Sequence, residues 1–505
     1  MHKSKVSAFL SEQIDPRLQQ HLFAPLIKRE TAASFADLVR LNKAHLVMLC
    51  ERAILEPETC RMLAHGIRQI EVAGPDALPQ DAAREDAFFN YEARLVEVTG
   101  ADVGGRLHTG RSRNDLKAAQ DRLRARAFAL DILDGTLAVR HTLAERAGEF
   151  ADVVMPGYTH LQPAQPTTFG WYLLGILKAL ERDYERIESC YQRINVNTLG
   201  AGALAGTSYP IDRERTRQLL GFDGIVEHTL DAVASRDYLT ELLAATTGLA
   251  TTWSRLAQDF YLMTSYEFQT LELPDRVAGT SSMMPQKKNM VVLEDLKAGG
   301  AQLLGAYTTA ISTVRGTQFT NTVDANREAF RWCWEALSKT VDSLHVLDVV
   351  IEGARPRPER MRQLVEGNFS AATDLADAMV QDAGLPFRLA HHVTGAVIRA
   401  AAAAGMRSNE ITSALVAEVS EKEFGQRIEI APELLASVLD PARGAERRRG
   451  TGGPAQADIS GMRSASLARV QADQAAQLGR RARIAAADVA LDAAFDHLHT
   501  SAGSR

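Results

Sequence analysis

The sequence predicts an all-α protein built around very long helices. Only 6% of its 505 residues are aromatic, and Ala, Leu, Arg and Glu dominate, which is a composition typical of helical proteins. Apolar residues also recur at helical spacing over several long stretches that contain no proline. Helices of this length pack as a bundle, so a helical bundle is the predicted architecture.

The first of these helices is predicted over residues 115–150, with Asn114 as its N-cap. A helix of about 30 residues would be roughly 45 Å long. Its apolar positions are Leu123, Ala127, Leu130, Leu133 and Leu137. Further long helices are predicted over 168–194, 236–271, 290–315 and 327–351.

Shorter helical patterns flank the long ones, and a stretch rich in Gly, Arg and Pro interrupts the chain near 441–456. Long helices bury more apolar surface than one chain can cover, so a homo-oligomer is expected. The predicted divisions are an N-terminal helical domain, a central long-helix domain, a C-terminal helical domain and a helical extension, over 1–112, 113–355, 356–445 and 446–505.

Composition and charge argue against nucleic acid as a partner and against a membrane location. There are 57 Lys and Arg against 63 Asp and Glu, a net charge of −6, so nucleic acid is not an expected partner. The longest uncharged stretch, 153–177, contains three prolines and polar residues, so no membrane span is expected. The N-terminus lacks the apolar core of a signal peptide, and a cytoplasmic location is expected.

The four cysteines, Cys50, Cys60, Cys190 and Cys333, are far apart and form no C-x-x-C pair. Isolated cysteines of a cytoplasmic protein behave as small buried hydrophobic residues. We therefore expect all four to be reduced, with neither a disulfide framework nor a zinc site.

Three links between the long helices carry the residues suited to chemistry. They read GGRLHTGRSRND over 104–115, GYTHLQP over 157–163 and AGTSSMMPQKKN over 278–289. Arginines and a serine at the start of a helix bind anions, but they equally suit a solvated helix cap. The lone histidine and the lysine-rich loop also have purely structural interpretations. Each link by itself leaves both readings open.

Taken together, the segments HTGRSRND, MPGYTHLQPAQPTTF, LGAGALAGT, LDAVASRDY and SSMMPQKKN resemble argininosuccinate lyases of the aspartase/fumarase superfamily, over residues 80–450. The resemblance implies a homotetramer whose central domains form a 20-helix bundle, with each active site built from three subunits. It also implies a reversible anti-elimination that releases fumarate from an N-succinyl amine. No metal or organic cofactor is implied.

The resemblance also assigns roles to individual residues. Ser281 is the expected general base, and Lys287 and Asn289 are expected to stabilise the aci-carboxylate intermediate. His160 is expected to pair with Glu294, and either His160 or a bound water protonates the leaving amine. The expected ligands of the succinyl carboxylates are Ser112, Arg113, Asn114 and Thr159.

The chain departs from the family where the leaving amine binds. Phe319, Asp324 and Arg327 stand where the family has Tyr, Gln and Lys. Arg327 offers a fork for a carboxylate and Asp324 an anion for an ammonium group. The favoured substrate is therefore ethylenediamine-N,N'-disuccinate or a similar aminopolycarboxylate.

Three alternatives remain. One is an argininosuccinate lyase that has drifted at tolerant positions. Another is a crystallin-like structural protein, which the presence of Ser281, Lys287, Asn289, His160 and Glu294 argues against. The last is an anion-binding bundle, for which the sequence offers only the basic run 447–449.

Overall fold

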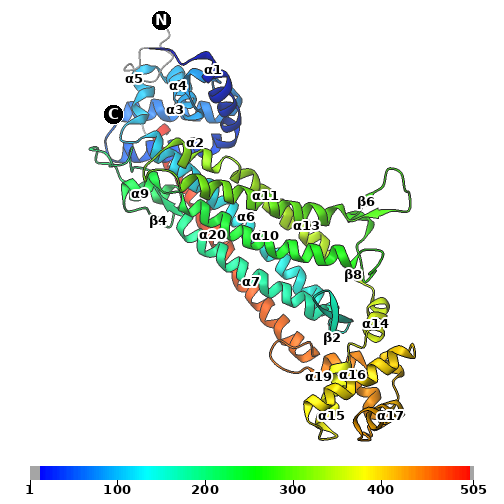
Figure 1. Cartoon of the computed structure of the whole chain (residues 1–505). Helices are drawn as coiled ribbons and strands as arrows, with labels where there is room; N and C mark the ends of the chain where they lie inside the picture. The colour runs from blue at the N-terminus through cyan, green and yellow to red at the C-terminus, as the bar shows by residue number, and fades with distance from the viewer. Residues whose placement is uncertain (1–11, 501–505) are drawn as a thin grey trace.

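The computed structural model describes residues 12–500 as an elongated, almost entirely helical molecule (Figure 1). Short helices form a region at the N-terminal end, long helices form the body, and a smaller helical region lies at the opposite end. The all-α prediction is confirmed. Within the described residues, none of the helices combines the length and apolar content needed to cross a bilayer.

The N-terminal region packs around its own hydrophobic core, which includes Leu41, Leu63, Tyr91 and Leu95. Asp86 caps one of its helices, because its Oδ1 accepts a hydrogen bond of 3.0 Å from the backbone N–H of Phe89. The helices are α1 (Pro16–Leu18), α2 (Ala24–Glu51), α3 (Pro57–Ala73), α4 (Ala87–Thr99) and α5 (Ala101–Gly104), with a π-helical turn at Gln19–Phe23.

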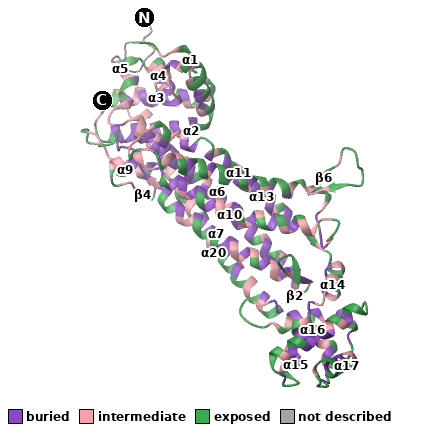
Figure 2. Ribbon diagram, viewed as in Figure 1, coloured by how far each residue is buried: buried purple, intermediate pink, exposed green. Residues whose placement is uncertain are grey.

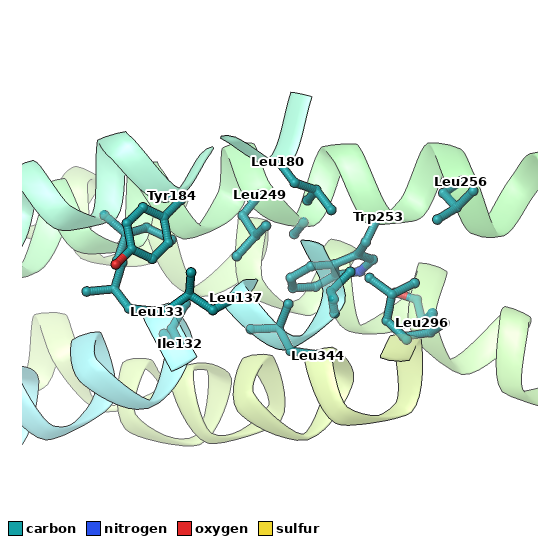
Figure 3. Packing of buried hydrophobic residues seen from close by; sticks show 14 of the residues in the cluster. Ile132, Leu133, Leu137, Leu180, Tyr184, Leu249, Trp253, Leu256, Leu296 and Leu344 are labelled. Carbon is teal, nitrogen blue, oxygen red and sulfur yellow. The ribbon is translucent and has the colours of Figure 1, made fainter. Parts of the chain in front are cut away.

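The body is a bundle of five long helices with a continuous apolar core (Figure 3). Trp253 is almost fully buried in it, and its indole N–H donates a hydrogen bond of 3.0 Å to the carbonyl of Leu296 on the neighbouring helix. The five are α6 (Arg113–Glu149), α7 (Phe169–Ile194), α10 (Asp237–Met263), α11 (Val291–Val314) and α13 (Cys333–Gly353).

Short elements connect the long helices. The strands form two-stranded ladders only: β1 (Val154–Thr159) with β2 (Gln162–Thr168), β3 (Val196–Asn197) with β4 (Gly224–Ile225), β5 (Leu271–Glu272) with β8 (Arg355–Pro356), and β6 (Gly279–Thr280) with β7 (Lys288–Asn289). The helices among them are α8 (Arg213–Leu219), α9 (Thr229–Ala234) and α12 (Val323–Asn326). Single 3-10 turns lie at Pro75–Ala77, Ala82–Arg84, Gly105–His108, Asp275–Val277, Glu328–Phe330 and Ser408–Glu410.

The C-terminal region has a third core around Leu375, Met379, Val393 and Val397. It contains α14 (Pro358–Gly367), α15 (Ala372–Gln381), α16 (Phe387–Ala403), α17 (Ser413–Phe424), α18 (Pro432–Leu439) and α19 (Pro441–Arg447). The existence of three cores accords with several domains, while the boundaries given above stay predictions.

The chain then returns along the whole bundle as one 45-residue helix, α20 (Gln456–Thr500) (Figure 1). Its far end reaches the N-terminal core, where Phe495 is fully buried. Asp492 there contacts Lys43 of α2 at 2.9 Å, and Lys43 also contacts Glu71 of α3 at 2.6 Å. The C-terminal helix therefore ties the two ends of the molecule together.

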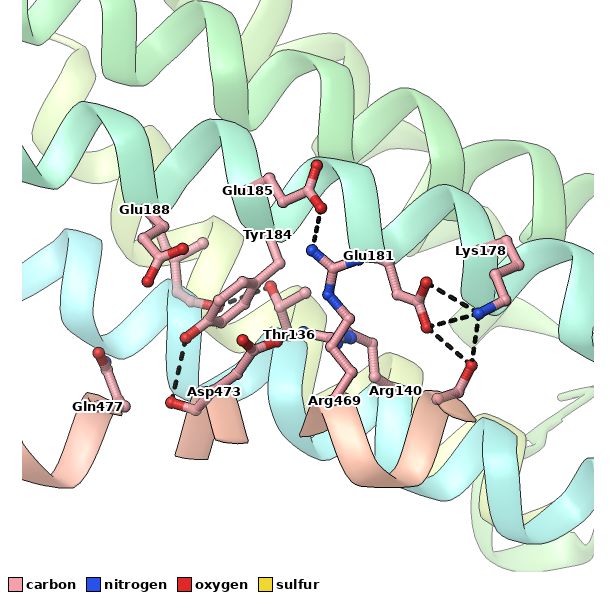
Figure 4. Close-up of polar contacts among 12 residues, drawn as sticks. Thr136, Arg140, Lys178, Glu181, Tyr184, Glu185, Glu188, Arg469, Asp473 and Gln477 are labelled. Atoms are coloured by element: carbon pink, nitrogen blue, oxygen red, sulfur yellow. Dashed lines mark hydrogen bonds and ion pairs between the residues drawn. The ribbon is translucent and has the colours of Figure 1, made fainter. Parts of the chain in front are cut away.

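Polar contacts hold the middle of α20 against α6 and α7 (Figure 4). The fully buried guanidinium of Arg140 lies 2.7 Å from the carboxylate of Asp473. The Ser466 hydroxyl donates a hydrogen bond of 2.7 Å to Glu181, and the Gln477 amide donates one of 2.8 Å to the carbonyl of Leu130. Ion pairs on the rim of this contact, such as Arg469 with Glu185, are half exposed.

The structure corrects the cysteine prediction. Cys50 and Cys60 form a disulfide, whereas the expectation was four reduced thiols. A short turn joins α2 to α3 and brings the two Cα atoms to 6.1 Å, a spacing that a disulfide requires and that no short sequence motif announces. Cys190 and Cys333 are free and buried as expected, and burial raises the pKa of each thiol to about 12.

Two other differences concern the ends of elements. The helix predicted over 236–271 ends at Met263, because the chain reverses and the N–H of Thr270 bonds the carbonyl of Met263. The helix predicted over 327–351 begins only at Cys333.

The link over 154–168 forms the hairpin β1–β2, since its three prolines exclude a helix.

The Arg140–Asp473 pair gives the first prediction. Asp473→Ala leaves a guanidinium buried without its carboxylate, so the free energy of unfolding should fall by about 3 kcal/mol. Urea denaturation followed by circular dichroism measures this change. The matched control, Glu185→Ala, removes an exposed ion pair on the same helix interface and should change stability by less than about 1 kcal/mol. Equal losses in the two variants would contradict the role given to the buried pair.

Candidate active site

The first site segment is the start of α6. Ser112 is its N-cap, so the prediction of Asn114 was wrong by two residues. The Ser112 hydroxyl accepts a hydrogen bond from the N–H of Asn114 at 3.3 Å, and the backbone N–H of Ser112 donates to Asp115 at 2.8 Å. This reciprocal capping box leaves the first turn of a 37-residue helix well defined. The helix N-terminus also favours an anion in front of it.

Asp115 anchors this segment to a second loop. Its Oδ2 accepts hydrogen bonds from the N–H groups of Gly200 at 2.7 Å and Gly202 at 3.1 Å. Gly202 has a φ of +64°, and a Cβ on it would lie 2.4 Å from the carbonyl oxygen of Gly206, so this close approach requires glycine. Burial raises the pKa of Asp115 to about 6, while the N–H donors from Ser112, Gly200 and Gly202 act to lower it.

Two predicted carboxylate ligands follow Ser112. The guanidinium of Arg113 lies 2.9 Å from Asp86 and 3.2 Å from Glu85, and it stacks 4.7 Å from the ring centroid of Phe89. The side-chain amide of Asn114 donates a hydrogen bond of 3.1 Å to the carbonyl of Ala203. The guanidinium therefore has a fixed position, and an arriving carboxylate would compete with Asp86 and Glu85 for it.

A cleft of about 350 Å³ opens beside these residues. Arg113 and Asn114 line one part of it, and Glu30 of α2 and Arg327 line another. The Nε of Arg327 contacts Glu328 at 2.8 Å. The structure thus brings Arg327 together with the predicted carboxylate ligands. Phe319 and Asp324 do not line this cleft, and Phe319 is 65% exposed.

The second site segment is the tip of the β1–β2 hairpin. Thr159 pairs with Gln162, and His160 and Leu161 form the two-residue turn between them. Both turn residues have positive φ, 54° and 57°, although neither is glycine. An L residue in this conformation costs about 1–2 kcal/mol, and such strain is concentrated at functional sites. Thr159 and His160 are exposed at the tip.

The third segment is the loop between β6 and β7, most of which is exposed (Figure 2). The Ser281 hydroxyl oxygen accepts hydrogen bonds from the N–H groups of Met284 at 2.9 Å and Met283 at 3.3 Å. The Asn289 side chain donates a hydrogen bond of 3.3 Å to the carbonyl of Thr280, and Lys287 is exposed. Two N–H donors on one serine oxygen form an arrangement that stabilises negative charge there.

Glu294 lies in the first turn of α11, close after this loop. Its carboxylate accepts a hydrogen bond of 2.9 Å from the hydroxyl of Tyr261, and this bond raises the pKa of Tyr261. Within residues 12–500 of one chain, no contact joins Glu294 to His160. Their expected pairing is therefore not formed inside the chain.

The first segment lies at the N-terminal end of the bundle, whereas the β1–β2 hairpin and the β6–β7 loop lie towards its other end (Figure 1). Ser112 starts α6, which at 37 residues is about 55 Å long, and the hairpin follows its other end. The β6–β7 loop also lies away from the N-terminal region. One chain therefore places the predicted residues in separate groups: Ser112, Arg113, Asn114 and Arg327 at one end, Thr159 and His160 on the hairpin, and Ser281, Lys287, Asn289 and Glu294 around the third loop.

Comparisons with known proteins identify the family. A lyase family model matches residues 43–305, and an argininosuccinate lyase C-terminal model matches residues 369–444. The argininosuccinate lyase 1 of Shouchella clausii is 36% identical over 451 residues, which cover 89% of this chain and 91% of that protein. This chain belongs to the argininosuccinate lyase family. The argininosuccinate lyase of Methanocaldococcus jannaschii is 34% identical over 449 residues, which cover 88% of this chain and 91% of that protein.

Among solved structures, this chain is also similar to EDDS lyases. An EDDS lyase in complex with formate superposes with a TM-score of 0.87 at 29% identity and covers 97% of both chains. A variant of EDDS lyase with bound fumarate gives the same values. The chain is accordingly a fumarate-releasing carbon–nitrogen lyase of the aspartase/fumarase superfamily.

The sequence prediction missed several residues that shape the site. Asp115 was visible as the acidic third residue of a capping box, but its bonds to Gly200 and Gly202 come from a loop far along the chain. Glu30 enters the cleft from α2 without any motif of its own. Within the described residues, no group of three or more His, Cys, Asp and Glu side chains is placed to hold a metal.

The anchor residue gives the second prediction. Asp115→Ala removes the acceptor that holds the Ser112 loop and the Gly200 loop together, so stability should fall by about 2 kcal/mol and the KM for fumarate should rise about tenfold. Thermal unfolding and fumarate consumption in the amine-addition direction measure the two effects. Asp115→Asn keeps one acceptor oxygen, so its stability and its KM for fumarate should lie between those of the unmodified enzyme and those of Asp115→Ala. An unchanged KM in a folded Asp115→Ala enzyme would contradict the anchoring role.

Proposed function

We propose that this lyase cleaves N-succinyl amines whose leaving amine carries acidic groups of its own, with ethylenediamine-N,N'-disuccinate as the favoured substrate. The observation that carries the proposal is Arg327, which lines the same cleft as Arg113 and Asn114. A guanidinium binds a carboxylate through two parallel hydrogen bonds, so this end of the cleft suits an acidic amine. The fold similarity to EDDS lyase supports the same substrate class.

In the proposed reaction, Ser281 is the base. Its deprotonated oxygen, stabilised by the N–H groups of Met283 and Met284, removes a proton from the Cβ of the succinyl group. The electron pair moves into the adjacent carboxylate and gives an aci-carboxylate dianion, which Lys287 and Asn289 stabilise. Collapse of the dianion forms the double bond of fumarate and breaks the C–N bond, and the leaving amine takes up a proton from His160 or from a bound water.

The remaining residues bind and orient the substrate. Ser112, Arg113 and Asn114, at the start of α6, hold the succinyl carboxylates together with Thr159. His160 and Glu294 form the proposed charge relay. Since one chain holds these groups apart, the complete site requires neighbouring subunits.

We propose that four copies of the chain pool their long helices and share each active site among three subunits. Exposed apolar residues on the bundle support this assembly: Leu304 is 50% exposed and Ile311 is 39% exposed, both on α11. Apolar side chains on a long bundle helix are usually covered. A tetramer would cover them and would bring the three separate segments into contact.

The favoured alternative substrate is argininosuccinate. The sequence relatives from Shouchella clausii and Methanocaldococcus jannaschii, both named argininosuccinate lyases, support it. Location in the cytoplasm remains part of the proposal for either substrate. Direct competition between the two substrates decides between them.

The shared site gives the third prediction. Ser281→Ala and His160→Asn chains should each be inactive as folded tetramers, because each lacks one essential group. Co-refolding the two variants should restore a measurable fraction of activity, since a hybrid tetramer contains some intact sites. Fumarate absorbance measures the recovery, and co-refolding Ser281→Ala with itself is the control. Hybrid tetramers that form but stay inactive would contradict the shared site.

The substrate gives the fourth prediction. Ethylenediamine-N,N'-disuccinate should be cleaved with a kcat/KM at least about tenfold above that for argininosuccinate, because the cleft carries Arg327 in place of the family's lysine. Arg327→Lys should reduce this ratio, whereas Asp324→Gln, at an exposed position outside the cleft, should change it less. Faster cleavage of argininosuccinate by the unmodified enzyme would favour the alternative substrate.

A further inference from the structure

The active-site cleft continues beyond Arg327 into a second chamber of about 390 Å³. This chamber lies among α2, α6 and the start of α13 and contains none of the predicted catalytic residues. The two spaces are adjacent, because they share the lining residues Glu30, Ser34, Lys117, Gln120, Asn326 and Arg327. A substrate held by Arg113 can therefore extend past Arg327 into this chamber.

One face of α6 sets the spacing along the two spaces. Lys117 and Arg124 follow Arg113 on this helix and both line the second chamber. At 1.5 Å per residue, they lie about 6 Å and about 16 Å further along the helix axis, and their side chains lean back towards its N-terminus. A whole extended N-succinyl amine, rather than its leaving half alone, is needed to extend along this distance, and the Arg124 side chain leans back to meet it.

Arg124 is a cation without a carboxylate partner among the described residues. Its guanidinium carbon lies 4.5 Å from the ring centroid of Trp334 on α13, which fixes its position. Burial lowers the pKa of Arg124, while Asp121 and Asp37 act to raise it. Lys117, by contrast, contacts Asp121 at 3.2 Å. Arg124 is thus positioned and free to bind an anion, whereas Arg29 and Arg331, which also line the chamber, are exposed.

The opposite wall carries acidic groups from α2. Asp37 and Glu30 both line the chamber. Burial raises the pKa of Asp37 to about 6, although the charges of Arg40, Arg124 and Lys117 lower it. A buried carboxylate of this kind is stabilised by a nearby cation. The chamber therefore offers a cation from α6 and anions from α2.

We propose that the second chamber binds the far end of the leaving amine, a head group with a carboxylate beside an ammonium, through Arg124 and the acids Asp37 and Glu30. The inference rests on the proposed lyase reaction in the adjoining cleft. Two classes of substrate contain this head group. In a disuccinylated diamine it is the second N-succinyl group, and in argininosuccinate it is the α-amino acid end of arginine.

Matched pairs of amines test this proposal in the addition direction, with the full chain in its native assembly and fumarate as the other reactant. One pair is N-(2-aminoethyl)aspartate and ethylenediamine, and the other is arginine and agmatine. The members of each pair differ in carboxylate content, so each pair isolates the head group. The unmodified enzyme should prefer the carboxylated member of the pair that it uses by at least about tenfold in kcat/KM.

Arg124→Gln should lower kcat/KM for the carboxylated amine by at least about tenfold and leave that for its carboxylate-free partner within about twofold. The KM for fumarate should stay unchanged. Arg388→Gln, at an exposed arginine of the C-terminal region, is the control and should alter neither amine. If Arg124→Gln does not assemble, Arg124→Lys, which keeps the positive charge but loses the guanidinium fork, makes the same comparison and should weaken only the carboxylated amine.

Equal effects of Arg124→Gln on both members of a pair, or no effect on either, would overturn the proposal. Equal use of both members by the unmodified enzyme would overturn it as well, while leaving the lyase reaction intact. No consumption of fumarate with any amine would instead overturn the proposed function. The pair that shows the preference identifies the source of the head group.

Discussion

The length of α6 is the constraint on which the rest of the molecule depends. At 37 residues it carries the capped turn at Ser112 at one end and leads to the His160 hairpin beyond the other. Its middle packs on α7, α13 and α20 through one continuous apolar core. A rigid rod of about 55 Å cannot bring its own ends together, so the groups needed for elimination stay apart in one chain.

Local strain and anchoring prepare each separated segment before any assembly. Asp115 holds the Ser112 turn through backbone N–H groups of a distant loop, and His160 occupies a left-handed turn in a proline-flanked hairpin. Ser281 already has two N–H donors on its oxygen. Each segment is therefore preorganised, so the proposed assembly would supply proximity more than rearrangement.

The C-terminal helix gives this arrangement its rigidity along the bundle. Through Asp473 it forms an ion pair with the buried Arg140, and through Asp492 it reaches Lys43 in the N-terminal region. Both contacts join segments more than three hundred residues apart. They hold α2 against the bundle, and α2 supplies Glu30 and Asp37 to the two adjoining spaces.

The sequence by itself determined the all-helical class and the long central helices, and it predicted roles for the loop residues Ser112, His160 and Ser281, because helical periodicity and short motifs are local properties. It misjudged the Cys50–Cys60 pair and gave no sign of the chamber beside Arg124. These features depend on which surfaces of distant helices face each other. Only the tertiary structure decided them, since contacts between helices far apart in the chain are set by packing of the whole core and leave no periodic trace in the sequence.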